Sequence, residues 1–226
     1  MKRVEKIIRQ ILDDPEAAAD GVLVNRLLDK FHDGAPLEYL HPLLLSPDPR
    51  IASSGAWIAS ELGSRGKPLL QIAFSLLRHA DKRVRFWVID CVLEWADSSN
   101  GREVAGVISL LDDPEKAVRW KTMMFLYRSS KDQLESALAW LSRNEPESAY
   151  LAGLRWLLSD SAQDAAEVEK MLEHPVDEMR KYGVVAAARM ATSNKHPLTV
   201  AASSGEPDIV EFATDSLGFL DTPKKS

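Results

Sequence analysis

The chain has 226 residues, of which 45% are hydrophobic and 27% are charged, and its formal net charge at pH 7 is −6. This composition excludes a disordered chain of low hydrophobicity. The acidic balance argues against a dedicated nucleic-acid-binding protein, which needs a strong basic footprint. The single cysteine, Cys91, excludes an intramolecular disulfide and fits a reducing compartment. With no signal-peptide run and no long apolar stretch, the sequence predicts a cytoplasmic protein without a membrane span.

The first residues predict two helices. Residues 2–13 place apolar side chains on one helical face, with the i, i+3, i+4, i+7 spacing of an amphipathic helix. Pro15 interrupts this pattern, and a second helix is expected over 17–32, ending near Gly34. Neither segment carries the repeat that follows them along the chain. We therefore expect residues 1–35 to form an N-terminal cap, which an array of stacked helices needs to cover its first apolar face.

A short pattern then recurs along the chain. It consists of two apolar residues, a turn containing Asp, Glu or Pro, and an apolar–Arg step that opens another apolar segment. The second apolar residue lies at positions 45, 77, 111, 141 and 172, so successive copies are 32, 34, 30 and 31 residues apart. A step of this length is typical of stacked supersecondary units. Such arrays usually provide a long binding surface, so binding is the first functional hypothesis and catalysis the second.

Each copy of the pattern predicts an outer helix A followed by an inner helix B. Asp and Pro before the B segments supply capping oxygens and a preset φ angle. No segment has the sustained alternation of a β-strand. The A helices are expected near 36–45, 67–79, 101–111, 131–142, 162–173 and 196–203, and the B helices near 48–63, 81–96, 115–129, 146–159, 176–192 and 207–219.

The best copies carry a family resemblance. The segments Asp81-Lys82-Arg83-Val84-Arg85 and Glu115-Lys116-Ala117-Val118-Arg119 resemble the opening of the second helix in HEAT repeats, notably the short bacterial kind grouped with phycobilisome-lyase repeats. The resemblance covers about residues 36–220 and weakens over 145–160. It implies an all-α fold, a right-handed α-α superhelix (solenoid) of about six helix pairs in a single domain, followed by a disordered tail at 221–226. It implies little about function, because one fold hosts many activities.

Three arginines occupy the same place in the pattern, one residue after the key apolar position: Arg85, Arg119 and Arg180. One interpretation is a basic ladder that binds an acidic ligand. The favoured interpretation is a ladder that ties neighbouring repeats together, with Asp48, Asp81 and Glu115 as its partners. Such exposed pairs help to set register more than they add stability.

Large apolar residues recur on the predicted B helices away from the core positions. Phe86 and Trp120 fall at one equivalent position, and Trp57 and Met124 at another. One interpretation is an apolar band on a concave inner face, because aromatic residues, Met and Arg anchor protein interfaces. The other is burial between tightly curved repeats. Under the first interpretation, the predicted partner-binding residues are Trp57, Phe86, Asp90, Trp120, Met124, Tyr150 and Arg155.

The sequence contains few signs of chemistry. Asp90 and Glu94 lie one helical turn apart, a spacing that suits acid–base catalysis or cation binding, but a solvated acidic face is favoured. The five histidines lack metal-ligand spacing, and Cys91 falls on a predicted buried face. We therefore predict no catalytic residues, no cofactor and no metal.

Three functions follow from these observations. The first is a non-catalytic protein-binding module, such as an adaptor, a regulatory subunit or an inhibitor, including the immunity protein of a bacterial toxin. Its partner is expected to be a protein, a basic one being suggested by the net charge. The alternative is a DNA-repair enzyme of the HEAT-like alkylpurine DNA glycosylase type, with Trp57, Trp120, Trp156 and Asp90 in its concave face. The repeat subtype also suggests a bilin lyase-like role. Oligomeric state is not predicted.

Overall fold

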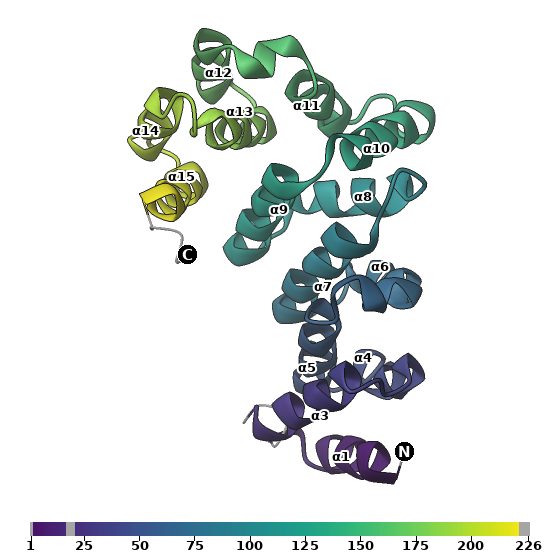
Figure 1. The fold of residues 1–226 in the computed structure, drawn as a ribbon. Helices are drawn as coiled ribbons and strands as arrows, with labels where there is room; N and C mark the ends of the chain where they lie inside the picture. Colours follow the sequence, from purple (N-terminus) through teal and green to yellow (C-terminus); the bar gives the residue numbers. More distant parts are fainter. Residues whose placement is uncertain (1, 17–20, 222–226) are drawn as a thin grey trace. The chain divides into compact units, whose positions relative to one another are not determined.

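The computed structural model describes residues 2–16 and 21–221, and within these ranges every regular element is an α-helix or a 3-10 helix (Figure 1). The chain divides into two compact units, residues 1–96 (unit 1) and 97–226 (unit 2). Each unit has its own internal packing. The all-α solenoid predicted from the repeat is confirmed. Its right-handed twist and the boundary predicted at residue 35 stay predictions. Of the tail predicted at 221–226, Asp221 is instead the last residue of α15, and residues 222–226 lie outside the described residues.

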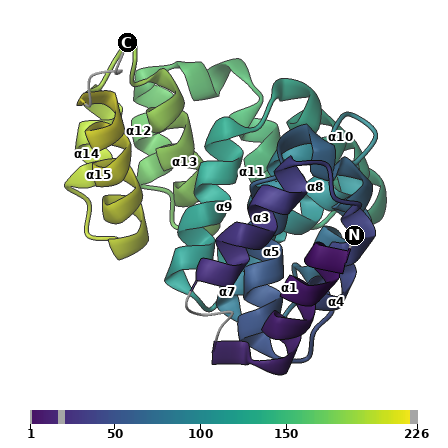
Figure 2. The same ribbon diagram turned by 60° about the horizontal axis from the view of Figure 1, so that its bottom comes forward.

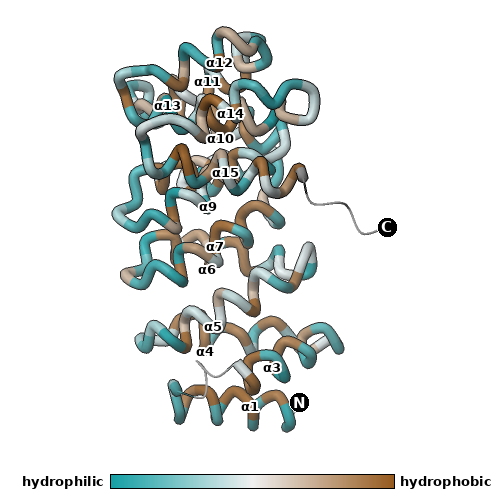
Figure 3. The backbone as a smooth tube through the Cα atoms, turned by 90° about the vertical axis from the view of Figure 1, so that its left-hand side faces the viewer, coloured by the Kyte–Doolittle hydropathy of each residue, from teal (hydrophilic) through white to brown (hydrophobic). Residues whose placement is uncertain are grey.

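Unit 1 contains the predicted cap helices and two helix pairs. Along α1, hydrophobic and hydrophilic residues alternate with the helical turn (Figure 3). Helix α1 packs on α3, α4 on α5, and both α5 and α6 on α7. The elements of unit 1 are α1 (Lys2–Asp13), α3 (Val22–His32), η1 (Leu37–Leu40) with α4 (His41–Leu44), α5 (Pro49–Ser60), η2 (Gly63–Leu69) with α6 (Leu70–Leu76), and α7 (Lys82–Trp95).

The helix predicted over 17–32 begins later than expected, at Val22. Gly21 has φ 81°, in the left-handed region that glycine adopts without steric cost. A right-handed helix does not continue through such a residue. The left-handed conformation of Gly21 therefore sets the start of α3. Residues 17–20 lie outside the described part of the chain.

Unit 2 contains the four remaining helix pairs. All the predicted repeat helices of both units are confirmed, with ends that differ by a few residues. Four of the outer A helices include a 3-10 segment that the sequence did not predict. The elements of unit 2 are α8 (Gly101–Ile108) with η3 (Ser109–Asp112), α9 (Lys116–Arg128), α10 (Lys131–Asn144), α11 (Ala149–Leu157), η4 (Asp160–Gln163) with α12 (Ala165–Leu172), α13 (Asp177–Met190), α14 (His196–Ala202) and α15 (Pro207–Asp221).

The recurring arginines hold the turn between the A and B helices. In Arg85, Arg119 and Arg180 alike, Nη1 donates to the backbone carbonyls six and five residues earlier, at 2.7–3.3 Å. These carbonyls lie in the turn and have no place in either helix ladder. Because unsatisfied carbonyls are unfavourable, one arginine side chain secures the turn in each of these three repeats. Two of the arginines also link repeats, since Arg119 pairs with Asp208 and Arg180 with Glu206.

The predicted partners Asp48 and Asp81 are wrong as links between repeats. Asp48 accepts a hydrogen bond from the backbone N–H of Arg50 at 2.9 Å, and Asp81 from that of Arg83 at 2.8 Å. Each aspartate also pairs with the guanidinium of the same arginine. A short carboxylate at the N-cap lies beside the first turn of its own helix, so it satisfies orphan N–H groups there.

In unit 2, helices that are not neighbours in the chain also pack together. Helix α9 contacts both α13 and α15, an arrangement visible in Figures 1 and 2. Arg119 pairs with Asp208 at 2.6 Å, and the ring centroids of Trp120 and Phe212 are 6.5 Å apart. Repeats of unit 2 therefore also contact repeats that are not their neighbours in the chain, unlike the units of a simple stacked array.

The weak fourth copy of the repeat explains this packing. Helix α11 has 9 residues, whereas α9 has 13 and α13 has 14. Because α11 is shorter, it does not separate α9 from α13 along their whole length, and the two longer helices meet. Lys181 of α13 also donates to the backbone carbonyl of Leu111 at 2.9 Å. Tyr182, fully buried, packs over Gly153 of α11.

Substitution of Gly153 by alanine tests this close packing. A Cβ atom at Gly153 would lie 2.1 Å from the ring of Tyr182, so α11 and α13 would have to separate. We expect Gly153→Ala to lower the free energy of unfolding by about 1–3 kcal/mol, the usual cost of overpacking. Urea denaturation followed by far-UV circular dichroism measures this change.

The matched control is Gly218→Ala in α15, where an added Cβ meets no atom within 4 Å. The higher helix propensity of alanine should then stabilise the protein by about 1 kcal/mol. If both variants unfold at the same urea concentration as the natural protein, the packing argument fails.

Candidate functional site

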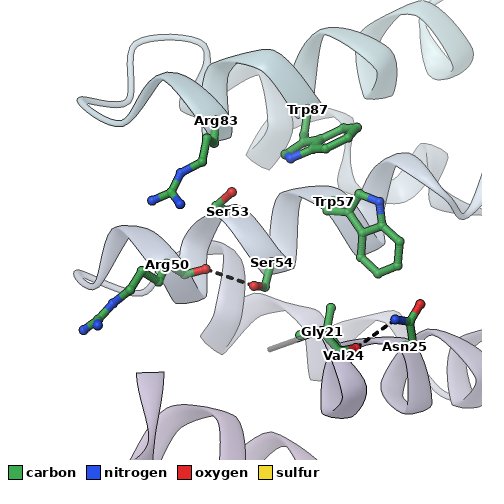
Figure 4. A pocket seen from close by; sticks show the side chains of 9 residues that line it. All are labelled: Gly21, Val24, Asn25, Arg50, Ser53, Ser54, Trp57, Arg83 and Trp87. Carbon is green, nitrogen blue, oxygen red and sulfur yellow. Dashed lines mark hydrogen bonds between the residues drawn. The ribbon is translucent and has the colours of Figure 1, made fainter. Parts of the chain in front are cut away.

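A pocket in unit 1 lies between α3, α5 and α7. Its volume is about 280 Å³. Figure 4 shows its lining side chains, which come from the starts and middles of the three helices. They are Gly21, Val24, Asn25, Arg50, Ser53, Ser54, Trp57, Arg83 and Trp87. This set combines two aromatic rings, two guanidinium groups and small polar residues.

Helical spacing places these groups together. Arg50 and Trp57 are seven residues apart on α5, and Arg83 and Trp87 are four residues apart on α7, so each pair lies on one helical face. Helices α5 and α7 pack directly against each other. Each helix therefore contributes one arginine and one tryptophan to the same pocket (Figure 4).

The arginines are held in place by the aspartates that cap their helices. Arg50 donates to Asp48 through Nε at 3.1 Å and Nη2 at 2.8 Å, and Arg83 donates to Asp81 in the same way at 3.2 and 3.0 Å. Glu16 also pairs with Arg50. Bidentate pairs of this kind orient the planar guanidinium. The two cationic groups are thus positioned before any ligand binds.

The same pairs change the pKa of the aspartates. Hydrogen bonds from the Arg50 guanidinium lower the pKa of Asp48 from 3.8 to about 2. At Asp81, burial acts to raise the pKa, but the hydrogen bonds from Arg83 outweigh it and the pKa is lowered. Both carboxylates therefore stay ionised and keep the arginines charged and paired.

The two tryptophans are half-buried. Trp87 stacks edge to face on Phe86, with ring centroids 5.1 Å apart and an interplanar angle of 89°. Partly covered tryptophans beside arginines are the side chains that dominate binding energy in protein interfaces. The described lining contains serine hydroxyls but no carboxylate, imidazole or thiol that would act as a base toward them.

The predicted site residues of unit 1 meet at this pocket only in part. Trp57 lines it, and Phe86 supports it through Trp87. Asp90 lies half-buried further along α7 and is not among the lining residues. Their role in binding stays a prediction.

The four predicted site residues of unit 2 occupy different settings. Trp120 packs on Phe212, and its buried Nε1 has no hydrogen-bond partner in the described structure. Met124 is half-buried on α9, and Arg155 is exposed on α11. The hydroxyl of Tyr150 donates to the Asp112 carboxylate, and burial followed by this hydrogen bond raises the pKa of Tyr150. Tyr150 thus links two repeats in the folded protein.

Sequence reasoning missed Arg50, Arg83, Trp87 and Asn25. One signal was present, because Arg50 and Arg83 each follow a capping aspartate by two residues. Trp87 lies three residues after its key apolar position, outside the two aromatic positions that were compared. No sequence signal connects Asn25, in the cap, with helices α5 and α7. Its place in the pocket depends on how α3 packs.

Two further findings concern metal ligands and helix length among the described residues. They bring together no group of three or more His, Cys, Asp or Glu side chains suited to hold a metal ion. Every helix within residues 2–16 and 21–221 is too short or too polar to cross a lipid bilayer.

Comparison with known proteins adds to this description. The sequence matches no protein family and no curated protein. An engineered protein of known crystal structure is similar over 99% of this chain and 100% of its own, with 15% identity and a TM-score of 0.51. The succession of helix pairs laid down in chain order decides the fold. The chain is a helical-repeat solenoid.

Weaker similarities to the solenoid are also found. A designed armadillo repeat protein has 14% identity, with 96% of this chain and 99% of that chain covered and a TM-score of 0.49. A HEAT-like repeat protein from the archaeon Thermococcus onnurineus NA1 has 14% identity, with 95% of each chain covered and a TM-score of 0.47. At these identities the likeness concerns the fold alone.

The pairing of Asp48 with Arg50 predicts a pH dependence of stability. The folded pKa of Asp48 is about 2, against an ordinary value of 3.8. Its contribution is therefore fully present above pH 3.8 and is lost as the pH falls through 2. Asp48→Asn keeps a capping oxygen but removes the charge. We expect the difference in unfolding free energy between the natural protein and this variant to shrink below pH 4.

Urea denaturation at pH 2.5, 4 and 6 measures this difference. A difference that is the same at pH 2.5 and pH 6 would contradict the assigned pairing.

Proposed function

We propose that the solenoid is a protein-binding module and that the pocket of unit 1 is a binding site for a segment of its partner. The observation that carries this proposal is the convergence of two half-buried tryptophans and two oriented arginines from α5 and α7. Adaptor, regulatory and inhibitor roles, including toxin immunity, share this binding step. Each of these roles is a more specific form of the same proposal.

The lining also suggests the chemistry of the bound segment. An apolar side chain packs against the rings of Trp57 and Trp87, while the N–H groups of Arg83, a side chain that is 54% exposed, donate to carbonyl or carboxylate oxygens. Both charged residues of the lining are arginines. Each is paired with an aspartate, but the N–H groups that remain can donate to an acidic group and not to a basic one, so the lining does not favour the basic partner suggested by the net charge. We propose a segment with an apolar anchor and a neighbouring acidic residue.

The pocket gives no support to the DNA glycosylase alternative. Among its described lining residues there is no carboxylate that would activate a water, although tryptophan and arginine also suit nucleic-acid contacts. Duplex DNA is therefore the competing ligand to test against peptides.

The test is a selection of peptides from a random library on the purified protein. The affinities of the selected peptides are then measured by isothermal titration calorimetry. We expect an apolar–acidic consensus and a loss of affinity of at least tenfold in the double variant Trp57→Ala/Trp87→Ala, because removing a hot-spot residue costs about 2 kcal/mol or more.

The matched control is Phe219→Ala, which removes an aromatic side chain that is 61% exposed on α15 and far from the lining in sequence. It should leave the affinities unchanged. The proposal is overturned if no peptide is selected, or if the double variant, shown to be folded by circular dichroism, binds as well as the natural protein. Duplex DNA retained in a low-salt gel shift, and lost in the double variant, would favour the repair-enzyme alternative instead.

A further inference from the structure

A second pocket, with a volume of about 380 Å³, lies within unit 2 between α11, η4 and α13. Its apolar wall consists of Leu157, Ala162, Ala186 and Met190. Arg189 of α13 provides its charged group, and Gln163 and Ser193 provide neutral polar groups. The volume lies within the range of small-ligand sites, about 300–1,000 Å³. None of these residues takes part in the pocket of unit 1.

Arg189 differs from the repeat arginines described above. Its Nη2 donates to two backbone carbonyls at the end of α9, those of Leu126 and Ser129. Its buried Nε has no hydrogen-bond partner. Within the described residues no carboxylate lies within ion-pair distance of Arg189, whereas Arg119 and Arg180 both have carboxylate partners. Burial lowers the pKa of Arg189.

The charge of Arg189 is therefore only partly compensated. The end of a helix carries about half of a negative elementary charge, which leaves a net positive charge on the guanidinium. An arginine does not lose its proton in a protein, so neutralisation by deprotonation is not available. A desolvated charge without a counter-ion is unfavourable, and an anion that reaches the pocket gains by pairing with it.

We propose that this pocket binds a carboxylate that carries a short apolar body. The carboxylate pairs with the guanidinium of Arg189, and the apolar body packs against Leu157, Ala162 and Met190. The side chains of Gln163 and Ser193 offer further hydrogen bonds to the ligand. The carboxylate belongs either to a free small acid or to an acidic residue of a peptide, and the two sources share the same recognition chemistry.

Titrations of the ¹⁵N-labelled full chain, followed by NMR chemical shifts, test this proposal. Butyrate is the free-acid probe, butyramide its uncharged match, and N-acetylglutamate N-methylamide the peptide-like probe. We expect saturable shifts for residues around the pocket with at least one of the two carboxylates and none with butyramide. The carboxylate that binds with the lower dissociation constant identifies the ligand class, a free small acid or an acidic residue of a peptide.

Two variants separate the site from the fold. Arg189→Met removes the charge, but it also removes two hydrogen bonds to the end of α9. Ala162→Phe keeps Arg189 and fills the pocket, since Ala162 is a lining residue with 8% of its surface exposed. Each should raise the dissociation constant at least tenfold. The control is Arg143→Met, which removes an exposed arginine from α10 that is not among the lining residues and should leave the dissociation constant unchanged.

The proposal is overturned if neither carboxylate gives saturable shifts at concentrations up to about 20 mM, which would saturate a site with a dissociation constant of about 1 mM. It is also overturned if butyramide binds as well as butyrate, or if Ala162→Phe, with a native-like spectrum, binds as tightly as the natural protein.

Discussion

The short turn between the two helices of each repeat is the constraint on which the rest of the structure depends. In the turns before α7, α9 and α13, backbone carbonyls lie outside both helix ladders, and Arg85, Arg119 or Arg180 satisfies two of them. At α5 and α7, an aspartate at the N-cap satisfies the first N–H groups of the helix. Where these local bonds are present, they help to fix the relation between the A and B helices, which leaves the B faces to pack with each other.

The relation between the A and B helices explains the pocket of unit 1, and its interruption at α11 explains the pocket of unit 2. In unit 1 the capping aspartates orient Arg50 and Arg83, so the turn that stabilises each repeat also presents a cation beside a tryptophan. In unit 2 the short helix α11 interrupts the regular stacking, and α13 reaches α9. Arg189 then caps the end of α9 and is left beside a pocket without a carboxylate partner among the described residues. The short helix α11 thus gives rise to the pocket beside Arg189.

Most of the helices could be predicted, because each depends on local signals: apolar spacing, Asp or Pro at the start, and Gly or Ser between units. The candidate site could be predicted only in part. Trp57 was found from its position in the repeat, whereas Asn25 and Trp87 join it through the packing of α3 and α7. The roles of Asp48 and Asp81 were misjudged, because spacing does not reveal whether a carboxylate pairs within its own turn or across to the next repeat.

The sequence by itself determined the type and order of the described repeat helices and the all-α solenoid fold, because a helical period and its caps are encoded within one or two turns. Only the tertiary structure decided that Trp120 packs on Phe212, that Tyr150 bonds to Asp112, and that Arg189 lacks a carboxylate partner among the described residues. The first two contacts join residues 92 and 38 positions apart, and they depend on helix lengths and crossing positions. No local sequence pattern predicts which distant side chain will occupy the space beside a short helix.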